Sequence, residues 1–141
     1  MRKQTVLFLC SANSARSQMA EGLLRKYGGD RYEAHSAGME STGINPLAIQ
    51  VMNEIGIDIS GQRSKDVKEY LGKLAVQHLI FVCGKAEQQC PKLFLGAVKT
   101  YSWPFDDPAA AKGTEEDRLM KFREVRDQIQ ARVKSWLSDN L

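Results

Sequence analysis

The sequence predicts an α/β protein built on a parallel sheet. Short apolar runs alternate along the chain with segments of helical periodicity, which is the order that parallel sheets require. A chain of 141 residues, of which 43% are hydrophobic and 26% charged, is long enough to bury a full core. No repeat, low-complexity tract or linker interrupts it, so we expect residues 1–141 to form a single domain.

Four segments are predicted to be strands because each is a short, mainly apolar run bounded by turn-forming or polar residues. They are residues 5–9, 32–37, 78–83 and 97–102. The runs at 5–9 and 78–83 are almost wholly apolar, which is typical of strands buried on both faces. The run at 97–102 is weaker, and we expect it at an edge of the sheet.

Four segments carry helical signals, namely residues 17–27, 45–55, 65–74 and 114–137. Asn45-Pro46 is a typical start for the second, and Ser64 or Asp66 is the candidate cap of the third. Acidic residues at 115–117 suit the dipole of the last helix. Its apolar stripe comprises Phe122, Val125, Ile129, Val133, Trp136 and Leu137.

Composition narrows the class of protein. The net charge of +3 suits a small anionic substrate and gives no argument for nucleic acid. No run of 18 apolar residues exists, and the apolar stretch near the start is too short for a signal peptide, so we expect a cytoplasmic protein without a membrane span. In that compartment the three cysteines are expected to be catalytic or redox-active.

A nucleophile loop is predicted between the first strand and the first helix. Cys10 ends the strand, and Arg16-Ser17 opens the helix. Inward-pointing amides and a helix N-terminus bind oxyanions, and the planar fork of Arg16 matches two oxygens of one oxyanion. The positive surroundings favour the thiolate of Cys10, and the Ser17 hydroxyl could cap the helix or donate to that sulfur. The predicted binding loop comprises Ser11, Ala12, Asn13, Ser14, Ala15 and Arg16.

Cys83 and Cys90 form a second candidate redox element, although two inert buried thiols remain an alternative. Their spacing and the two histidines do not fit a zinc site. If residues 84–90 are helical, the two cysteines lie about 10 Å apart, beyond the reach of about 7 Å for a disulfide. We therefore hypothesise a segment that is helical when reduced and unwound when oxidised, with Gly84 and Pro91 at its borders.

Asp107 is the candidate general acid. Attack on an oxyanion requires a proton for the departing oxygen, and Pro108 restricts the backbone of the preceding Asp107. Two alternatives to this assignment remain. The aspartates could merely cap an Asp-Pro turn, or the neighbouring Asp106 could be the acid. Because ligands of open parallel sheets bind beyond the carboxyl ends of the strands, we expect Cys10, Cys83 and this loop at one rim.

These motifs resemble the low-molecular-weight protein tyrosine phosphatase family. The resemblance rests on Cys10-x5-Arg16-Ser17 behind a strand, the internal Asn13 and Asp107-Pro108, and it extends to residues 36–38 and 56–60. Cys83-x6-Cys90-Pro91 resembles the signature of its thioredoxin-coupled arsenate reductases. The family implies a three-layer domain, with a four-stranded parallel sheet between helices on both faces.

The resemblance also implies a reaction. Cys10 attacks arsenate, Arg16 and the loop amides hold its oxygens, and Asp107 protonates the leaving oxygen. Cys83 then attacks Cys10, releasing arsenite and forming a Cys10–Cys83 disulfide; Cys90 converts it to Cys83–Cys90, which thioredoxin reduces. The expected enzyme is a monomer without a tightly bound cofactor, and weak phosphatase side activity is expected.

The sequence departs from the family pattern at Ala12 and Ala15, where relatives often have glycine and cysteine. A positive φ at residue 12 would cost alanine about 1 kcal/mol or more. Some relatives bind potassium near positions matching Asn13, Glu21 and Ser36. Lys65 stands here in place of an acid, so we assign no metal site and hypothesise that its ammonium replaces the ion.

Two other functions remain open. A tyrosine phosphatase would use the same loop, but residues 109–111 are alanines where such relatives carry an aromatic pocket wall. A sensor would hold an oxyanion without turnover while its cysteines report redox state.

Overall fold

A four-stranded parallel sheet forms the centre of the molecule, as predicted. The computed structural model describes residues 3–70, 72–89 and 99–140. The strand order is β2-β1-β3-β4, and all neighbouring pairs are parallel. The strands are β1 (Gln4–Cys10), β2 (Tyr32–Gly38), β3 (His78–Phe81) and β4 (Lys99–Ser102).

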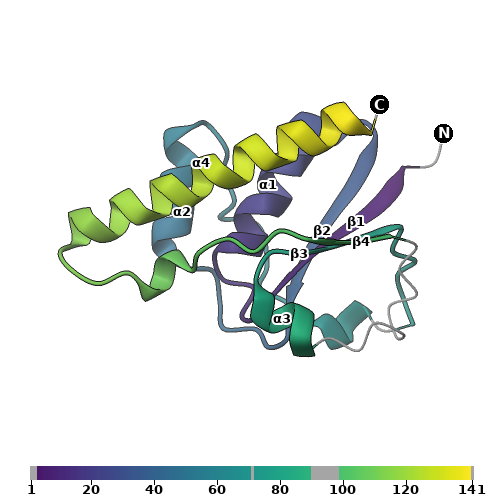
Figure 1. Cartoon of the computed structure of the whole chain (residues 1–141), viewed down its shortest axis with the longest axis horizontal. Coiled ribbons are helices and arrows are strands. Elements are labelled where there is room, and N and C mark those ends of the chain that lie inside the picture. The colour runs from purple at the N-terminus through teal and green to yellow at the C-terminus, as the bar shows by residue number, and fades with distance from the viewer. Residues whose placement is uncertain (1–2, 71, 90–98, 141) are drawn as a thin grey trace.

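Helices cover both faces of the sheet, which gives the three predicted layers. The helices are α1 (Arg16–Gly28), α2 (Pro46–Glu54), α3 (Gly84–Gln89) and α4 (Glu115–Asp139). Helices α1, α2 and α4 pack together above the sheet in Figure 1, and the short α3 lies below it. None of the helices in the described ranges is long and apolar enough to cross a membrane.

Burial explains the positions of the strands. Residues 5–10 of β1 and all of β3 are buried, as their apolar composition predicts, and both strands are central. Strand β4 has exposed residues and forms an edge, which confirms the prediction for its described part. Residues 97–98 lie outside the described residues.

Helix α4 packs onto the core through its predicted apolar stripe, and all six residues of the stripe are buried. Thr114 and Asp117 form a capping box, in which each side chain accepts from the other residue's backbone amide. Arg126 links α4 to α2, because its buried guanidinium donates hydrogen bonds to Val51 O at 2.9 Å and to Glu54 Oε1 at 2.8 Å.

The predicted helix over residues 65–74 is wrong. In the described part of that range, which leaves out residue 71, the structure has a 3₁₀ turn, η1 (Val67–Tyr70), and no α-helix. The Gly38 amide donates to Lys65 O at 2.8 Å, and Gly38 forms a bridge with Asp66, which keeps residues 65–66 extended beside β2. Gly72 has a φ of +68°, which is outside the right-handed helical region.

Truncation of the α4 stripe should destabilise the fold. Ile129 is fully buried, and Ile129→Ala should lower the free energy of unfolding by about 2–5 kcal/mol because it leaves a cavity. Met120 on the same helix is 59% exposed, and Met120→Ala should change that free energy by less than about 0.5 kcal/mol. Urea denaturation measures both, and equal losses would contradict this account of the core.

Candidate active site

The predicted loop connects the end of β1 to the start of α1 at the carboxyl edge of the sheet. Cys10 is the last residue of β1 and pairs with Gly38, the last residue of β2. A Cβ atom at Gly38 would lie 2.6 Å from Asn13 N and 2.4 Å from Glu40 O, which is too close for any side chain. Only glycine therefore lets the loop approach β2 here, a requirement that sequence reasoning missed.

The backbone of the loop is turned so that its carbonyls face outward. The carbonyl oxygens of Cys10, Ser11, Ala12 and Ser14 accept hydrogen bonds from the amides of Met39, Glu40, Thr42 and Asn45, respectively. In a planar trans peptide the N–H of the next residue points the opposite way. The amides of Ser11, Ala12, Asn13 and Ala15 are therefore directed to the other side of the loop, where they could donate to an anion.

The Cys10 sulfur is buried against this inner side. It is 2.8 Å from Ser17 Oγ, and Asn13 N donates to it over 3.1 Å. Ser17 was also a candidate cap of the helix, and that prediction is wrong. The residue before α1 is Ala15, which makes no side-chain cap, and Ser17 lies within the first turn. Its hydroxyl is directed to the sulfur instead.

Asn13 holds the shape of the loop. Its φ of +51° lies in the left-handed region, which asparagine tolerates better than most residues. Ala12 does not have a positive φ, so the cost that such a backbone would impose on alanine does not arise. The Asn13 side chain donates to Ser17 Oγ at 2.8 Å and accepts from the Lys65 backbone amide at 2.7 Å.

The structure brings Arg16 and Asp107 together. Arg16 Nη1 donates to Phe105 O at 3.1 Å, and Nη2 lies 3.9 Å from Asp107 Oδ2. Asp107 also accepts from Ala109 N at 3.0 Å, so it is both a turn cap and a neighbour of the loop. Asp106 points elsewhere, because its carboxylate pairs with Lys121 of α4 at 3.0 Å.

Cys83 lies at the same rim. It follows β3, is buried, and its sulfur accepts from Ala86 N at 3.4 Å in the first turn of α3. Cys10 and Cys83 are both free thiols. Residues 84–89 are helical, as the hypothesis for the reduced segment required, whereas Cys90 lies outside the described residues. A cavity of about 270 Å³ beside the loop is lined by Ser11, Met39, Glu40 and Lys85.

A buried polar group lies behind the loop. Lys65 Nζ contacts Arg63 O and lies 3.6 Å from Glu21 Oε1, which also accepts from Ser36 Oγ at 2.6 Å. Burial lowers the pKa of Lys65, and the Glu21 carboxylate opposes that shift. The ammonium places a positive charge beside Glu21, one of the predicted cation ligands, which disfavours a potassium ion at the same carboxylate. The described residues contain no group of three or more His, Cys, Asp or Glu side chains able to hold a metal ion.

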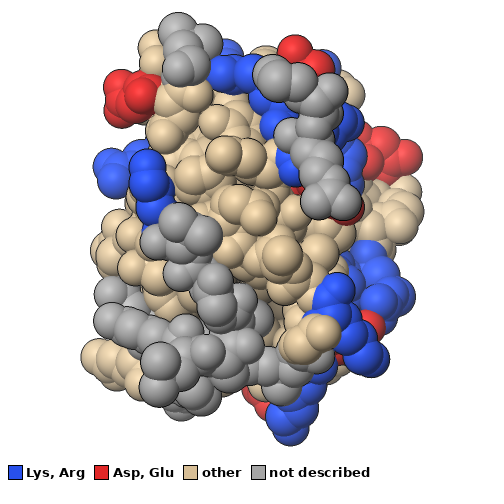
Figure 2. All heavy atoms as spheres, turned by 90° about the vertical axis from the view of Figure 1, so that its right-hand side faces the viewer, with Lys and Arg blue, Asp and Glu red and all other residues tan. Residues whose placement is uncertain are grey.

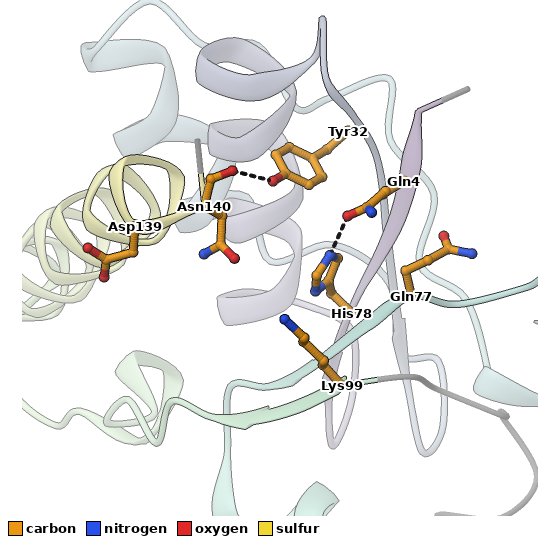
Figure 3. Close-up of a pocket in the computed structure, with 7 residues that line it drawn as sticks. All are labelled: Gln4, Tyr32, Gln77, His78, Lys99, Asp139 and Asn140. Carbon is orange, nitrogen blue, oxygen red and sulfur yellow. Dashed lines mark hydrogen bonds between the residues drawn. The ribbon is translucent and has the colours of Figure 1, made fainter. Parts of the chain in front are cut away.

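A larger cavity, of about 410 Å³, lies at the opposite edge of the sheet, beside the amino ends of the strands (Figure 3). Its His78 accepts or donates two hydrogen bonds, to Gln4 at 2.7 Å and Tyr101 at 2.9 Å, and burial lowers its pKa. Lysine and arginine side chains border this end of the molecule (Figure 2). The described residues that line this cavity include no cysteine, so it is separate from the cysteine rim.

The fold and the cysteine loop together define a family. Residues 5–141 match the model of the low molecular weight phosphotyrosine protein phosphatase family. The chain therefore belongs to this family, which confirms the predicted resemblance.

Within the family the chain is similar to arsenate reductases. It is 48% identical to the arsenate reductase of Shouchella clausii over 96% of both chains. A solved arsenate reductase in its phosphate-binding state is 33% identical, with a TM-score of 0.82 over 96% of this chain and 98% of the other. A thioredoxin-dependent arsenate reductase of Corynebacterium glutamicum is 25% identical, with a TM-score of 0.71 over 97% of this chain and 61% of the other.

The role of Lys65 can be tested with potassium. We expect the melting temperature of the unaltered protein to be the same in KCl and NaCl of equal ionic strength. Lys65→Ala should open space beside the Glu21 carboxylate and make the melting temperature rise by a few degrees in KCl relative to NaCl, because an ion bound to the folded state stabilises it. Lys68→Ala, at an exposed neighbouring position, is the control and should show no potassium effect.

Proposed function

We propose that this chain reduces arsenate to arsenite and that thioredoxin regenerates it. The observation that carries the proposal is the pair of buried free thiols, Cys10 and Cys83, at the adjoining ends of β1 and β3. The similarity to arsenate reductases supports the substrate, and the similarity to a thioredoxin-dependent one supports the electron donor.

The first step is attack by the Cys10 thiolate on As(V). The loop amides and the Arg16 guanidinium are donors for the oxygens of a tetrahedral oxyanion. One arsenate oxygen leaves as water after it accepts a proton, for which Asp107 is the nearest candidate, and a sulfur–arsenic bond forms. The contact of Asp107 with Arg16 at 3.9 Å, and the pairing of Asp106 with Lys121, favour Asp107 over Asp106.

The second step is attack by Cys83 on the Cys10 sulfur. The sulfur–arsenic bond breaks, its electron pair stays on arsenic, and arsenite leaves as the two thiols become a disulfide. Leu9 pairs with Phe81, and Val82 N donates to Leu9 O at 3.0 Å, so Cys83 lies one residue beyond the position beside Cys10. The two thiols therefore lie at the carboxyl ends of adjacent strands, and a disulfide requires their Cα atoms to come within about 7 Å.

The third step moves the disulfide to Cys83 and Cys90, which frees Cys10. A helical segment between the two cysteines keeps them too far apart, so residues 84–89 must unwind before this bond can form. The two thiols of thioredoxin then reduce Cys83–Cys90, which returns both electrons.

Phosphate-ester hydrolysis is the second candidate activity, because the same loop would bind phosphate. The turn after Asp107 is η3 (Pro108–Ala110), and the alanines there supply no aromatic wall for a phenyl ring. We therefore expect phosphatase activity to be weak relative to arsenate reduction.

Cysteine variants test the order of the steps in a single-turnover assay. We expect Cys83→Ser to abolish arsenite release but to keep oxyanion binding, because Cys10 and its loop are unchanged. We expect Cys90→Ser to complete at most one turnover and to accumulate Cys10–Cys83. Arsenite, free thiols and disulfide-linked peptides are measured after each mixing.

The products released in this assay distinguish the candidate functions. Release of arsenite with loss of two thiols supports the reductase. Release of phosphate alone supports a phosphatase, and the absence of both products supports a sensor. Sustained arsenate reduction by Cys83→Ser with thioredoxin would contradict the cascade. Replacing thioredoxin and its reductase with glutathione and glutaredoxin should remove multiple turnover.

A matched pair of carboxylate variants tests the acid. Asp107→Asn should slow the chemical step by about 10²–10⁴-fold, because an amide cannot donate the proton at comparable acidity. Asp106→Asn makes the same change one residue away and should have little effect. The rate of arsenic–sulfur adduct formation under single-turnover conditions measures both, and a larger effect at residue 106 would reverse the assignment.

A further inference from the structure

The cavity at the amino ends of the strands brings together every strand of the sheet. The first residue of each strand lines it, namely Gln4, Tyr32, His78 and Lys99. The end of α4 also lines it, through Asp139 and Asn140. Its volume of about 410 Å³ is within the range of small-molecule sites. The proposed reaction uses none of these residues, so the cavity is free for a second ligand.

Lys99 supplies the positive charge of this cavity. Its ammonium has no ion-pair partner among the described residues, and its side chain extends toward His78 and the end of α4 in Figure 3. Burial and the charge of Lys99 both lower the pKa of His78, so this charge acts on the groups that line the cavity. A single ammonium, with the Asp139 carboxylate in the same lining, suits a ligand with one negative charge better than a dianion.

Two side-chain amides add hydrogen-bond donors to the lining. Gln4 Oε1 accepts from His78 Nε2 at 2.7 Å. Gln77 Oε1 accepts from Thr5 N at 2.6 Å. Because both oxygens are engaged, the two NH₂ groups remain for other acceptors, and neither has a partner within the residues that the structure describes. A carboxylate, which only accepts and has two oxygens, matches an ammonium beside such donors.

Aromatic rings form part of the cavity wall. Tyr32 and His78 line the cavity, and their ring centroids lie 6.0 Å apart in an edge-to-face arrangement. Trp136 packs against both, with centroid distances of 4.8 Å to Tyr32 and 5.1 Å to His78. The indole N–H of Trp136 is buried and has no hydrogen-bond partner in the described part of the chain. Such an unsatisfied donor is rare in native structures. A wall of rings favours a ligand that is itself aromatic.

We propose that this cavity is a second binding site and that its ligand is a small aromatic monocarboxylate. The carboxylate pairs with Lys99 and accepts from the amides of Gln4 and Gln77, while the ring packs against Tyr32 and His78. Since the ligand contacts the first residues of the four strands and the end of α4, its binding stabilises the folded chain.

Benzoate and its neutral analogue benzamide test the proposal. The chain has two histidines, so proton NMR of the imidazoles follows the cavity through His78 and a position outside its lining through His35. We expect millimolar benzoate to give a saturable shift of the His78 signals without a shift of His35, and to raise the melting temperature. Benzamide lacks the charge and should bind about tenfold more weakly or worse. Cyclohexanecarboxylate keeps the charge but lacks the aromatic ring, and should also bind more weakly than benzoate.

Matched variants assign the binding to the cavity. Lys99→Met should weaken benzoate binding about tenfold or more and leave benzamide binding unchanged. Lys112→Met makes the same change at an exposed lysine outside the lining and should leave both affinities unaltered. Arg16→Ala removes the guanidinium of the Cys10 loop and should not change benzoate binding either, so the outcome does not depend on arsenate reduction.

Four results would overturn the proposal. The first is the absence of a saturable His78 shift with benzoate, and the second is equal affinity for benzoate and benzamide. The third is unchanged benzoate affinity in Lys99→Met, whose melting curve shows whether the variant is folded. The fourth, equal affinity for benzoate and cyclohexanecarboxylate, would remove the aromatic class of ligand.

Discussion

The left-handed backbone of Asn13 is the constraint on which the active-site rim depends. It turns the loop between β1 and α1 so that outward carbonyls accept from the amides of residues 39, 40, 42 and 45, while the Asn13 amide donates to the Cys10 sulfur. The close approach to Gly38 is possible only without a side chain there. One conformation therefore joins the ends of β1 and β2 and places the thiol among donors.

That conformation is stabilised by polar groups that are costly to bury unless they are paired. Asn13, Ser17, Gln18, Glu21, Ser36 and Lys65 are all buried and bind one another or nearby backbone. An unpaired buried donor or acceptor costs about 1–3 kcal/mol, so removing one member also penalises its neighbours. The network consequently resists partial rearrangement and keeps the thiol in one place.

The elements that sequence alone predicted are those with a periodic signal: the apolar runs of β1 and β3 and the stripe of α4. The candidate nucleophile Cys10, Arg16 and the candidate acid Asp107 were chosen from residue types and spacing near strand ends, and the structure places Arg16 3.9 Å from Asp107. The helix expected at 65–74 failed because pairing of Gly38 with residues 65–66 overrode local propensity. The contact between Gln18 and Gln62 could not be predicted, since a single hydrogen bond between distant residues leaves no pattern in a sequence.

The two described cysteines differ in how they are held, and the proposed chemistry needs that difference. The proposed attack needs Cys10 to be held in one position, and buried hydrogen bonds from Ser17 and Asn13 hold its loop. Cys83 must attack one sulfur and then be attacked by another, which requires movement. It precedes α3, a helix of six residues, and helices so short are marginally stable unless tertiary contacts support them. The buried network thus lies on the side of the proposed nucleophile, and the helix that we propose unwinds lies beside the thiol that we propose exchanges partners.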